Sequence, residues 1–207
     1  MSLFHDEGLS LIPIYWYNPR AIGLITFNII YQAQSVLREG SMADSNEDLG
    51  SIINKGDYYQ ATLSRVLEHD VKTVWAMLTE PTRFIDWLAP GEIELVKGGK
   101  AKLNFVDSGI VIDSEVSEYE EYSLFEYSWS SGDEPLRPVC WTLNELNDGT
   151  QLTLTLGIPD GEDVARSCAG WEAHLMMLLA AIEGVPIKFP FQRFVSSREA
   201  YNELMAK

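Results

Sequence analysis

Residues 164–182 read VARSCAGWEAHLMMLLAAI and carry the clearest structural signal in the chain. Their apolar side chains recur about every 3.6 residues, which is typical of an amphipathic helix. The acidic residues just before this run suit the positive N-terminal end of a helix, and Gly184 and Pro186 suit its end. The pattern predicts a long helix whose apolar stripe consists of Val164, Cys168, Trp171, Leu175, Leu178, Leu179 and Ile182.

The residues before this helix show a different periodicity, in which apolar and polar side chains alternate. Such alternation is typical of antiparallel strands with one buried face. Asp70 can cap a helix after the first of these strands, and Pro81 can begin a second short helix that runs through Trp87. The predicted strands are residues 59–67, 92–97, 100–106, 110–116, 125–129, 139–143 and 152–156.

This order of elements predicts the fold class. A long amphipathic helix must bury its apolar stripe, and the available surface is the face of a curved sheet. We therefore expect an α+β domain in which a curved antiparallel sheet of about six to seven strands wraps around a long C-terminal helix. A cavity is expected where the sheet grips the helix.

The net charge of −16 limits the classes of partner. An acidic field repels nucleic-acid phosphates and anionic lipid surfaces, so we predict neither nucleic-acid nor membrane binding. The remaining interpretations are simple solubility and attraction of a basic partner protein. Because 46% of the residues are hydrophobic, a wholly disordered chain is excluded.

Metal and cofactor motifs are not found in the sequence. Cys140 and Cys168 lack the spacing of a zinc site, and we expect two reduced thiols, with a disulfide as the alternative. The three histidines form no HxxxH or HExxH pattern, and no phosphate-binding loop or nucleophile elbow occurs. We therefore predict no metal, no cofactor and no assigned catalytic residue.

The first part of the chain differs from the rest. Residues 1–57 are predicted to form a poorly ordered N-terminal extension, and residues 58–207 a single domain. One hypothesis is that the natural chain starts at Met42; another is that residues 1–41 tether the protein to a membrane or a partner. The apolar runs within residues 1–41 are shorter than the ~18–20 residues that span a bilayer.

Several local patterns resemble one protein family. Residues 74–81 read VWAMLTEP and residues 84–87 read FIDW, and a Gly98-Gly99 hairpin follows. Residues 149–154 read GTQLTL, and residues 170–175 read GWEAHL. In this order they resemble the homologues of the heat-shock-protein-90 ATPase activator, within the START-like (SRPBCC) superfamily. The resemblance covers residues 58–185 and implies the helix-grip fold.

Large aromatic side chains fall on the predicted inner faces of these elements. They can simply fill the core, or some of them can line a cavity that holds a ligand. His174 lies beside the apolar stripe, either as a proton or hydrogen-bond donor at the rim or as a boundary histidine with its own partner. Arg65 is either an inward-facing group for a ligand carboxylate or a surface or paired arginine. The predicted ligand-binding residues are Trp87, Phe105, Tyr127, Trp129, Trp141, Trp171, His174 and Leu175.

These observations lead to one functional prediction and two alternatives. We expect a cytoplasmic monomer or homodimer that binds a small apolar or aromatic molecule. The family resemblance implies the first alternative, a co-chaperone-like regulator of a chaperone ATPase. The second alternative is a hydrolase or cyclase that uses the same cavity, as in some START-like relatives.

Overall fold

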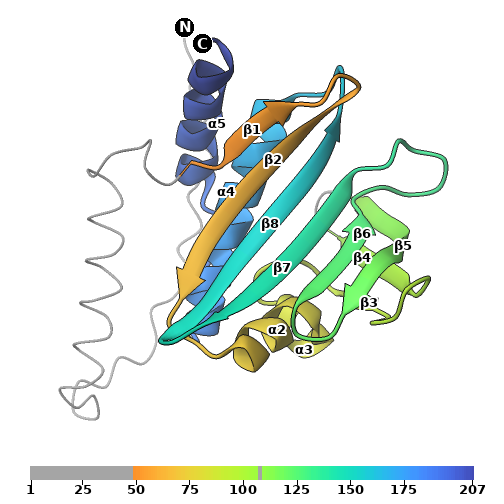
Figure 1. Cartoon of the computed structure of the whole chain (residues 1–207), viewed down its shortest axis with the longest axis vertical. Coiled ribbons are helices and arrows are strands. Elements are labelled where there is room, and N and C mark those ends of the chain that lie inside the picture. The colour runs from red at the N-terminus through yellow and green to blue at the C-terminus, as the bar shows by residue number, and fades with distance from the viewer. Residues whose placement is uncertain (1–48, 107–108) are drawn as a thin grey trace, which may run out of the picture. The chain divides into compact units, whose positions relative to one another are not determined.

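The computed structural model describes residues 49–106 and 109–207, which belong to one compact unit of the chain (Figure 1). The possible start at Met42 and the apolar runs of residues 1–41 lie outside the described residues. The elements are β1 (Ser51–Asn54), β2 (Tyr58–Leu67), α2 (Val71–Thr79), α3 (Pro81–Phe84), β3 (Gly91–Ile93), β4 (Lys100–Phe105), β5 (Ile110–Glu120), β6 (Leu124–Ser128), β7 (Pro138–Leu146), β8 (Gly149–Pro159), α4 (Val164–Ile182) and α5 (Phe191–Met205).

The strands form one 8-stranded sheet with the order β1-β2-β8-β7-β6-β5-β4-β3. Every neighbouring pair in this order is antiparallel. β2 pairs with β8 from Tyr58 opposite Pro159 to Leu67 opposite Thr150, so the first long strand and the last lie side by side. From β8 the sheet continues through β7, β6, β5 and β4 to the other edge strand, β3.

The eighth strand is β1, which lies inside the predicted extension of residues 1–57. It pairs with β2 from Ser51 opposite Thr62 to Asn54 opposite Tyr59, so the predicted boundary at residue 58 falls within a hairpin. Ile52 is partly buried, and the other three residues of β1 are exposed. A strand with so little buried surface has no apolar alternation in its sequence, which explains why the predicted strand count was lower.

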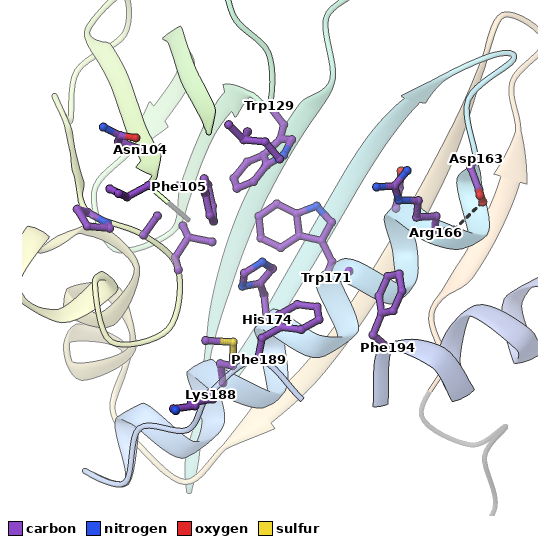
Figure 2. A pocket seen from close by; sticks show the side chains of 18 of the residues that line it. Asn104, Phe105, Trp129, Asp163, Arg166, Trp171, His174, Lys188, Phe189 and Phe194 are labelled. Carbon is purple, nitrogen blue, oxygen red and sulfur yellow. Dashed lines mark hydrogen bonds between the residues drawn. The ribbon is translucent and has the colours of Figure 1, made fainter. Parts of the chain in front are cut away.

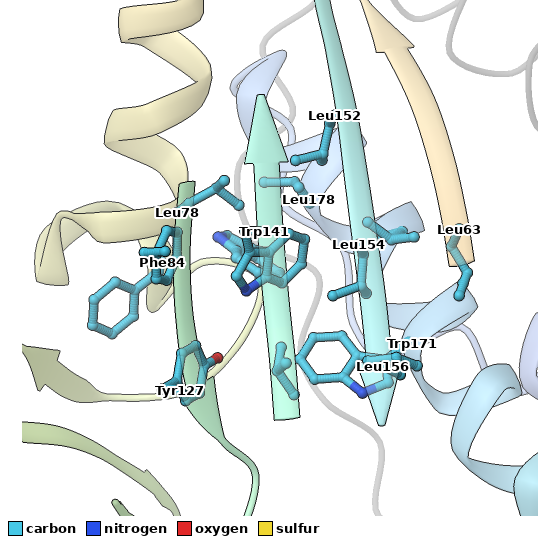
Figure 3. Close-up of a cluster of buried hydrophobic side chains, with 14 of the residues drawn as sticks. Leu63, Leu78, Phe84, Tyr127, Trp141, Leu152, Leu154, Leu156, Trp171 and Leu178 are labelled. Atoms are coloured by element: carbon cyan, nitrogen blue, oxygen red, sulfur yellow. The ribbon is translucent and has the colours of Figure 1, made fainter. Parts of the chain in front are cut away.

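Helix α4 lies against one face of the sheet (Figure 1). The side chains of its predicted apolar stripe belong to the core cluster or pack against it, as the sequence predicted. Trp171, Leu175 and Leu178 are buried there, in the cluster that contains Trp141 and Leu154 (Figure 3). Burying a side chain of this size contributes roughly 1.5–3 kcal/mol relative to leaving it exposed. The α+β helix-grip fold predicted from the sequence is therefore confirmed.

The two short helices close one end of the sheet. Asp70 caps α2 by accepting hydrogen bonds from the backbone N–H groups of Lys72 and Thr73, both at 3.0 Å. Helix α3 ends at Phe84, earlier than predicted, and a turn carries the chain to Trp87. The Trp87 indole N–H donates to the Met77 carbonyl oxygen at 2.8 Å, which fixes this turn against α2. Among the described residues, no helix is long and apolar enough to cross a membrane.

Candidate functional site

A cleft of about 1220 Å³ lies where α4 faces the β4–β5 end of the sheet (Figure 2). The loop that follows α3 forms one wall, and the α4–α5 connection with the first turn of α5 forms another. Trp171 and His174 project into the cleft from α4, and Trp129 approaches from the end of β6. The cleft therefore lies between the long helix and the sheet, at the end that the two short helices do not fill.

Aromatic rings form a continuous row along this cleft. The ring centroids of Phe105 and Trp129 are 5.4 Å apart at an interplanar angle of 65°, and those of Trp129 and Trp171 are 4.8 Å apart at 68°. Trp171 then meets Trp141 of the core at 5.6 Å and 77°. These are favourable edge-to-face geometries, and each pair supports the next. The row anchors the apolar surface of the cleft to the core.

His174 occupies the middle of the cleft wall that α4 provides. Its Nδ1 atom lies 3.2 Å from the backbone carbonyl oxygen of Trp87. Its ring packs against the rings of Phe105, Trp171 and Phe189, with centroid distances of 6.2, 5.8 and 5.6 Å. Burial lowers the pKa of His174, and the hydrogen bond to Trp87 opposes this shift only in part. The imidazole is therefore neutral at pH 7.

Charged residues surround the rim of the cleft. Glu162 pairs with Arg137 at 3.0 Å, and Asp163 caps α4 and pairs with Arg198. Lys188, in the α4–α5 connection, forms no ion pair with any residue that the structure describes. The acidic groups of the rim are thus already engaged within the protein.

The structure divides the predicted ligand-binding residues into two groups. Phe105, Trp129, Trp171 and His174 line the cleft. The other four lie in the core and each is 1% exposed: Trp87, Tyr127, Trp141 and Leu175. Their polar atoms have partners inside the protein. The Trp87 indole N–H donates to the Met77 carbonyl oxygen. Tyr127 has a side-chain hydrogen bond with Trp141, which partly offsets the increase in the pKa of Tyr127 that burial causes. These four support the cleft from below and do not face it.

The cleft wall formed by the α4–α5 connection and the first turn of α5 was not predicted from the sequence. Phe189 and Phe194 line the cleft, and their ring centroids are 6.0 Å apart. Phe189 precedes α5, which begins at Phe191, and Phe194 lies in its first turn. The available signal was the recurrence of phenylalanine at positions 189, 191 and 194, just after the Pro186 that ends the predicted long helix.

A buried polar network holds α5 in place. The Glu172 side chain is 0% exposed and accepts hydrogen bonds from Arg65, from Arg193 at 3.2 Å and from the Tyr201 hydroxyl at 2.8 Å. The Tyr201 hydroxyl in turn accepts from the Gly50 N–H at 2.8 Å. Arg65 is therefore a paired arginine, one of the two alternatives that the sequence left open. The network joins β2, α4, α5 and the segment before β1, and thereby fixes the helix that carries Phe194.

Metal chemistry has no support in the described part of the chain. Within residues 49–106 and 109–207, no three His, Cys, Asp or Glu side chains are placed to hold a metal ion. Cys140 and Cys168 are free thiols, and burial raises the pKa of Cys168 to about 12. The arrangement in the cleft is thus that of an apolar, aromatic surface with one neutral imidazole.

Comparison with known proteins identifies the family. Residues 68–183 match the family described as activator of Hsp90 ATPase homolog 1-like proteins, and the chain belongs to this family. The matched segment runs from the cap of α2 to the end of α4, so it contains the aromatic row and His174. A comparison with curated proteins gave no match.

Solved structures show the same fold. CalU16 from Micromonospora echinospora is 22% identical, with a TM-score of 0.61 over 77% of this chain and 96% of its own. EF2215 from Enterococcus faecalis, a conserved protein of unknown function, is 19% identical, with a TM-score of 0.61 over 86% of this chain and 98% of its own. DynU16, a protein in the dynemicin biosynthetic locus, is 28% identical with a TM-score of 0.56. That match covers 61% of this chain but about half of DynU16, 48% of its length.

Proposed function

We propose that the protein binds a small apolar or aromatic molecule in the cleft between α4 and the β4–β5 end of the sheet. The observation that supports this proposal best is the row of Phe105, Trp129 and Trp171 along an open cleft. Apolar surface left in water costs roughly 25 cal/mol per Å², so a ligand that covers these rings gains that free energy. Concave apolar surfaces with a few polar groups are typical ligand sites.

The dimensions favour a ligand of several rings or an equivalent chain. The volume of about 1220 Å³ is larger than the roughly 300–1,000 Å³ of common small-molecule pockets. Phe189 and Phe194 face the row from the other side, so a flat ligand can contact aromatic surface on both of its faces. Both walls are fixed, one by the core beneath Trp171 and the other by the Glu172 network.

Gly170 offers a direct test. It lines the cleft from α4, and a Cβ atom added there would meet nothing within 4 Å. Replacing a glycine inside a helix also removes a cost of roughly 0.5–1 kcal/mol, so substitutions here should fold well. Side chains of increasing size at this position would fill the cleft progressively, without touching the core.

The experiment is a fluorescence titration with N-phenyl-1-naphthylamine, a neutral aromatic probe. The original protein should bind it saturably, Gly170→Ala more weakly and Gly170→Leu at least tenfold more weakly. Ile53→Ala, on the opposite edge strand, is the control for loss of an exposed apolar side chain and should bind as the original protein does. If the original protein and both Gly170 variants bound the probe with equal affinity, the probe would bind outside the cleft and the proposal would be overturned.

The family match also supports the alternative of a chaperone regulator. Its test is a binding and ATPase assay with a purified chaperone of the heat-shock-protein-90 type. Absence of both binding and any change in ATPase rate would remove this alternative. The hydrolase or cyclase alternative stays a prediction. The side chains whose rings pack against His174 are Phe105, Trp171 and Phe189, and none of these is a carboxylate.

A further inference from the structure

The hydrogen bond between His174 and Trp87 fixes the proton position on the imidazole. A backbone carbonyl oxygen can only accept, so the 3.2 Å contact requires that His174 Nδ1 carries the proton and donates it. In a neutral imidazole the other nitrogen, Nε2, is then an acceptor with a free lone pair. The sequence left two alternatives for His174, a donor at the rim or a boundary histidine with its own partner. The geometry gives Nδ1 a partner within the protein and makes the remaining nitrogen an acceptor.

The acceptor carbonyl of Trp87 is held rigidly. The Trp87 side chain is 1% exposed, its indole N–H donates to Met77, and its ring meets Trp141 edge-to-face at 5.8 Å. His174 is in turn packed against Phe105, Trp171 and Phe189. The ring is therefore fixed at its Nδ1 edge and on its sides, which also fixes the direction of the Nε2 lone pair.

Nothing in the described part of the protein satisfies this lone pair. His174 makes one hydrogen bond with described residues, the one at Nδ1, and its side chain lines the cleft. Burial lowers the pKa of His174, so the ring does not gain a second proton near pH 7. In an empty cleft water can bind Nε2, but a ligand that fills the cleft must supply a donor or leave this nitrogen unpaired.

We propose that His174 Nε2 accepts a hydrogen bond from the ligand, so that the cleft selects aromatic molecules that carry an O–H or N–H donor. This inference rests on the proposed function, because it names the ligand class of the same cleft. The aromatic body covers Phe105 and Trp171, and a phenol-type hydroxyl or ring N–H points to His174. Once a ligand covers Nε2, the site discriminates against an analogue without the donor, because the acceptor then has no partner.

The test uses two matched probes and isothermal titration calorimetry at pH 7.5. 2-Naphthol carries a donor, whereas 2-methoxynaphthalene keeps the ring system and the oxygen but has none. The original protein should bind 2-naphthol about tenfold more tightly, as expected for one buried hydrogen bond. His174→Phe keeps a planar ring without Nε2 and should abolish the preference. His174→Gln, whose amide has both a donor and an acceptor, should restore part of it.

The possible outcomes separate the two proposals. Saturable binding of both probes with equal affinity would overturn the role of His174 and leave the cleft as the ligand site. Failure of both probes to bind would overturn both proposals. A preference for 2-naphthol that persists in His174→Phe would assign the acceptor to another group of the protein and overturn the inference.

A measurement on the original protein needs no variant. ¹⁵N NMR of the histidine rings should show His174 protonated at Nδ1 and unprotonated at Nε2. The Nε2 resonance should shift on addition of 2-naphthol much more than on addition of 2-methoxynaphthalene. Protonation at Nε2 in the free protein, or equal shifts with the two probes, would contradict the inference.

Discussion

Arg65 on β2 and Glu172 on α4 form an ion pair across the inner face of the sheet. Glu172 is 0% exposed and Arg65 is 15% exposed, so the pair is almost entirely removed from water. Removing a carboxylate from water is costly unless its oxygens are paired, and here Arg193 and Tyr201 complete the pairing. The position of α5 therefore depends on a charge that α4 buries.

Loss of Arg65 should destabilise the protein strongly. Arg65→Ala leaves the buried Glu172 carboxylate with fewer partners, and removing one partner of a buried pair costs about 3–5 kcal/mol. Because Arg193 and Tyr201 remain, we expect the free energy of unfolding, measured in urea, to fall by about 2–4 kcal/mol. The matched control is Arg83→Ala, whose partner Glu80 is exposed. That variant should lose at most about 1 kcal/mol; equal losses would show that burial of the pair does not matter.

Loss of the Tyr201 hydroxyl should loosen the segment before β1. In Tyr201→Phe, Gly50 loses the acceptor of its N–H, and Glu172 loses a donor. A buried group without its partner costs about 1–3 kcal/mol, so the free energy of unfolding should fall by about that amount. Hydrogen exchange at Gly50 should accelerate at the same time. Unchanged protection of this amide in the variant would contradict the proposed link between α5 and the edge of the sheet.

His174 should make stability depend on pH in the acidic range. Burial lowers the pKa of His174 in the folded protein, whereas its pKa in the unfolded chain is the ordinary value of about 6.5. As the pH falls below about 6.5, the unfolded chain therefore binds protons before the folded protein does, and stability decreases until the folded pKa is passed. His174→Phe should reduce this slope between pH 7 and pH 5, measured by urea unfolding. His69→Gln is the control variant and should keep it.

Cys168 should resist thiol reagents in the folded protein. Burial, together with the nearby charge of Glu172, raises its pKa to about 12, so very little thiolate exists at pH 8. In Cys140→Ser, 5,5′-dithiobis(2-nitrobenzoic acid) should react with Cys168 only at the rate of unfolding and then rapidly in urea. Fast reaction in the folded variant would show that α4 is not packed on the sheet at this point.

The fold was predictable because its main elements carry strong periodic signals. Helix α4 has apolar residues at helical spacing over its whole length, and the long strands alternate. The cleft was predictable only in part. Phe105, Trp129 and Trp171 share their periodicity with core residues such as Trp141, and spacing cannot distinguish a ring that covers a cleft from one beneath it. Glu172 was missed because its partners come from β2 and α5, far away in sequence.

The distinction between the two groups of aromatic residues can be measured directly with Trp141→Leu and Trp129→Leu. Trp141 is 1% exposed, so its truncation leaves a cavity in the core and should cost about 3 kcal/mol in urea unfolding. Trp129 lines the cleft, so its truncation should cost less stability but weaken binding of N-phenyl-1-naphthylamine severalfold. Once corrected for the unfolded fraction, probe affinity in Trp141→Leu should stay within about threefold of the original. If Trp129→Leu instead kept full affinity while Trp141→Leu lost it, the probe would bind in the core rather than in the cleft.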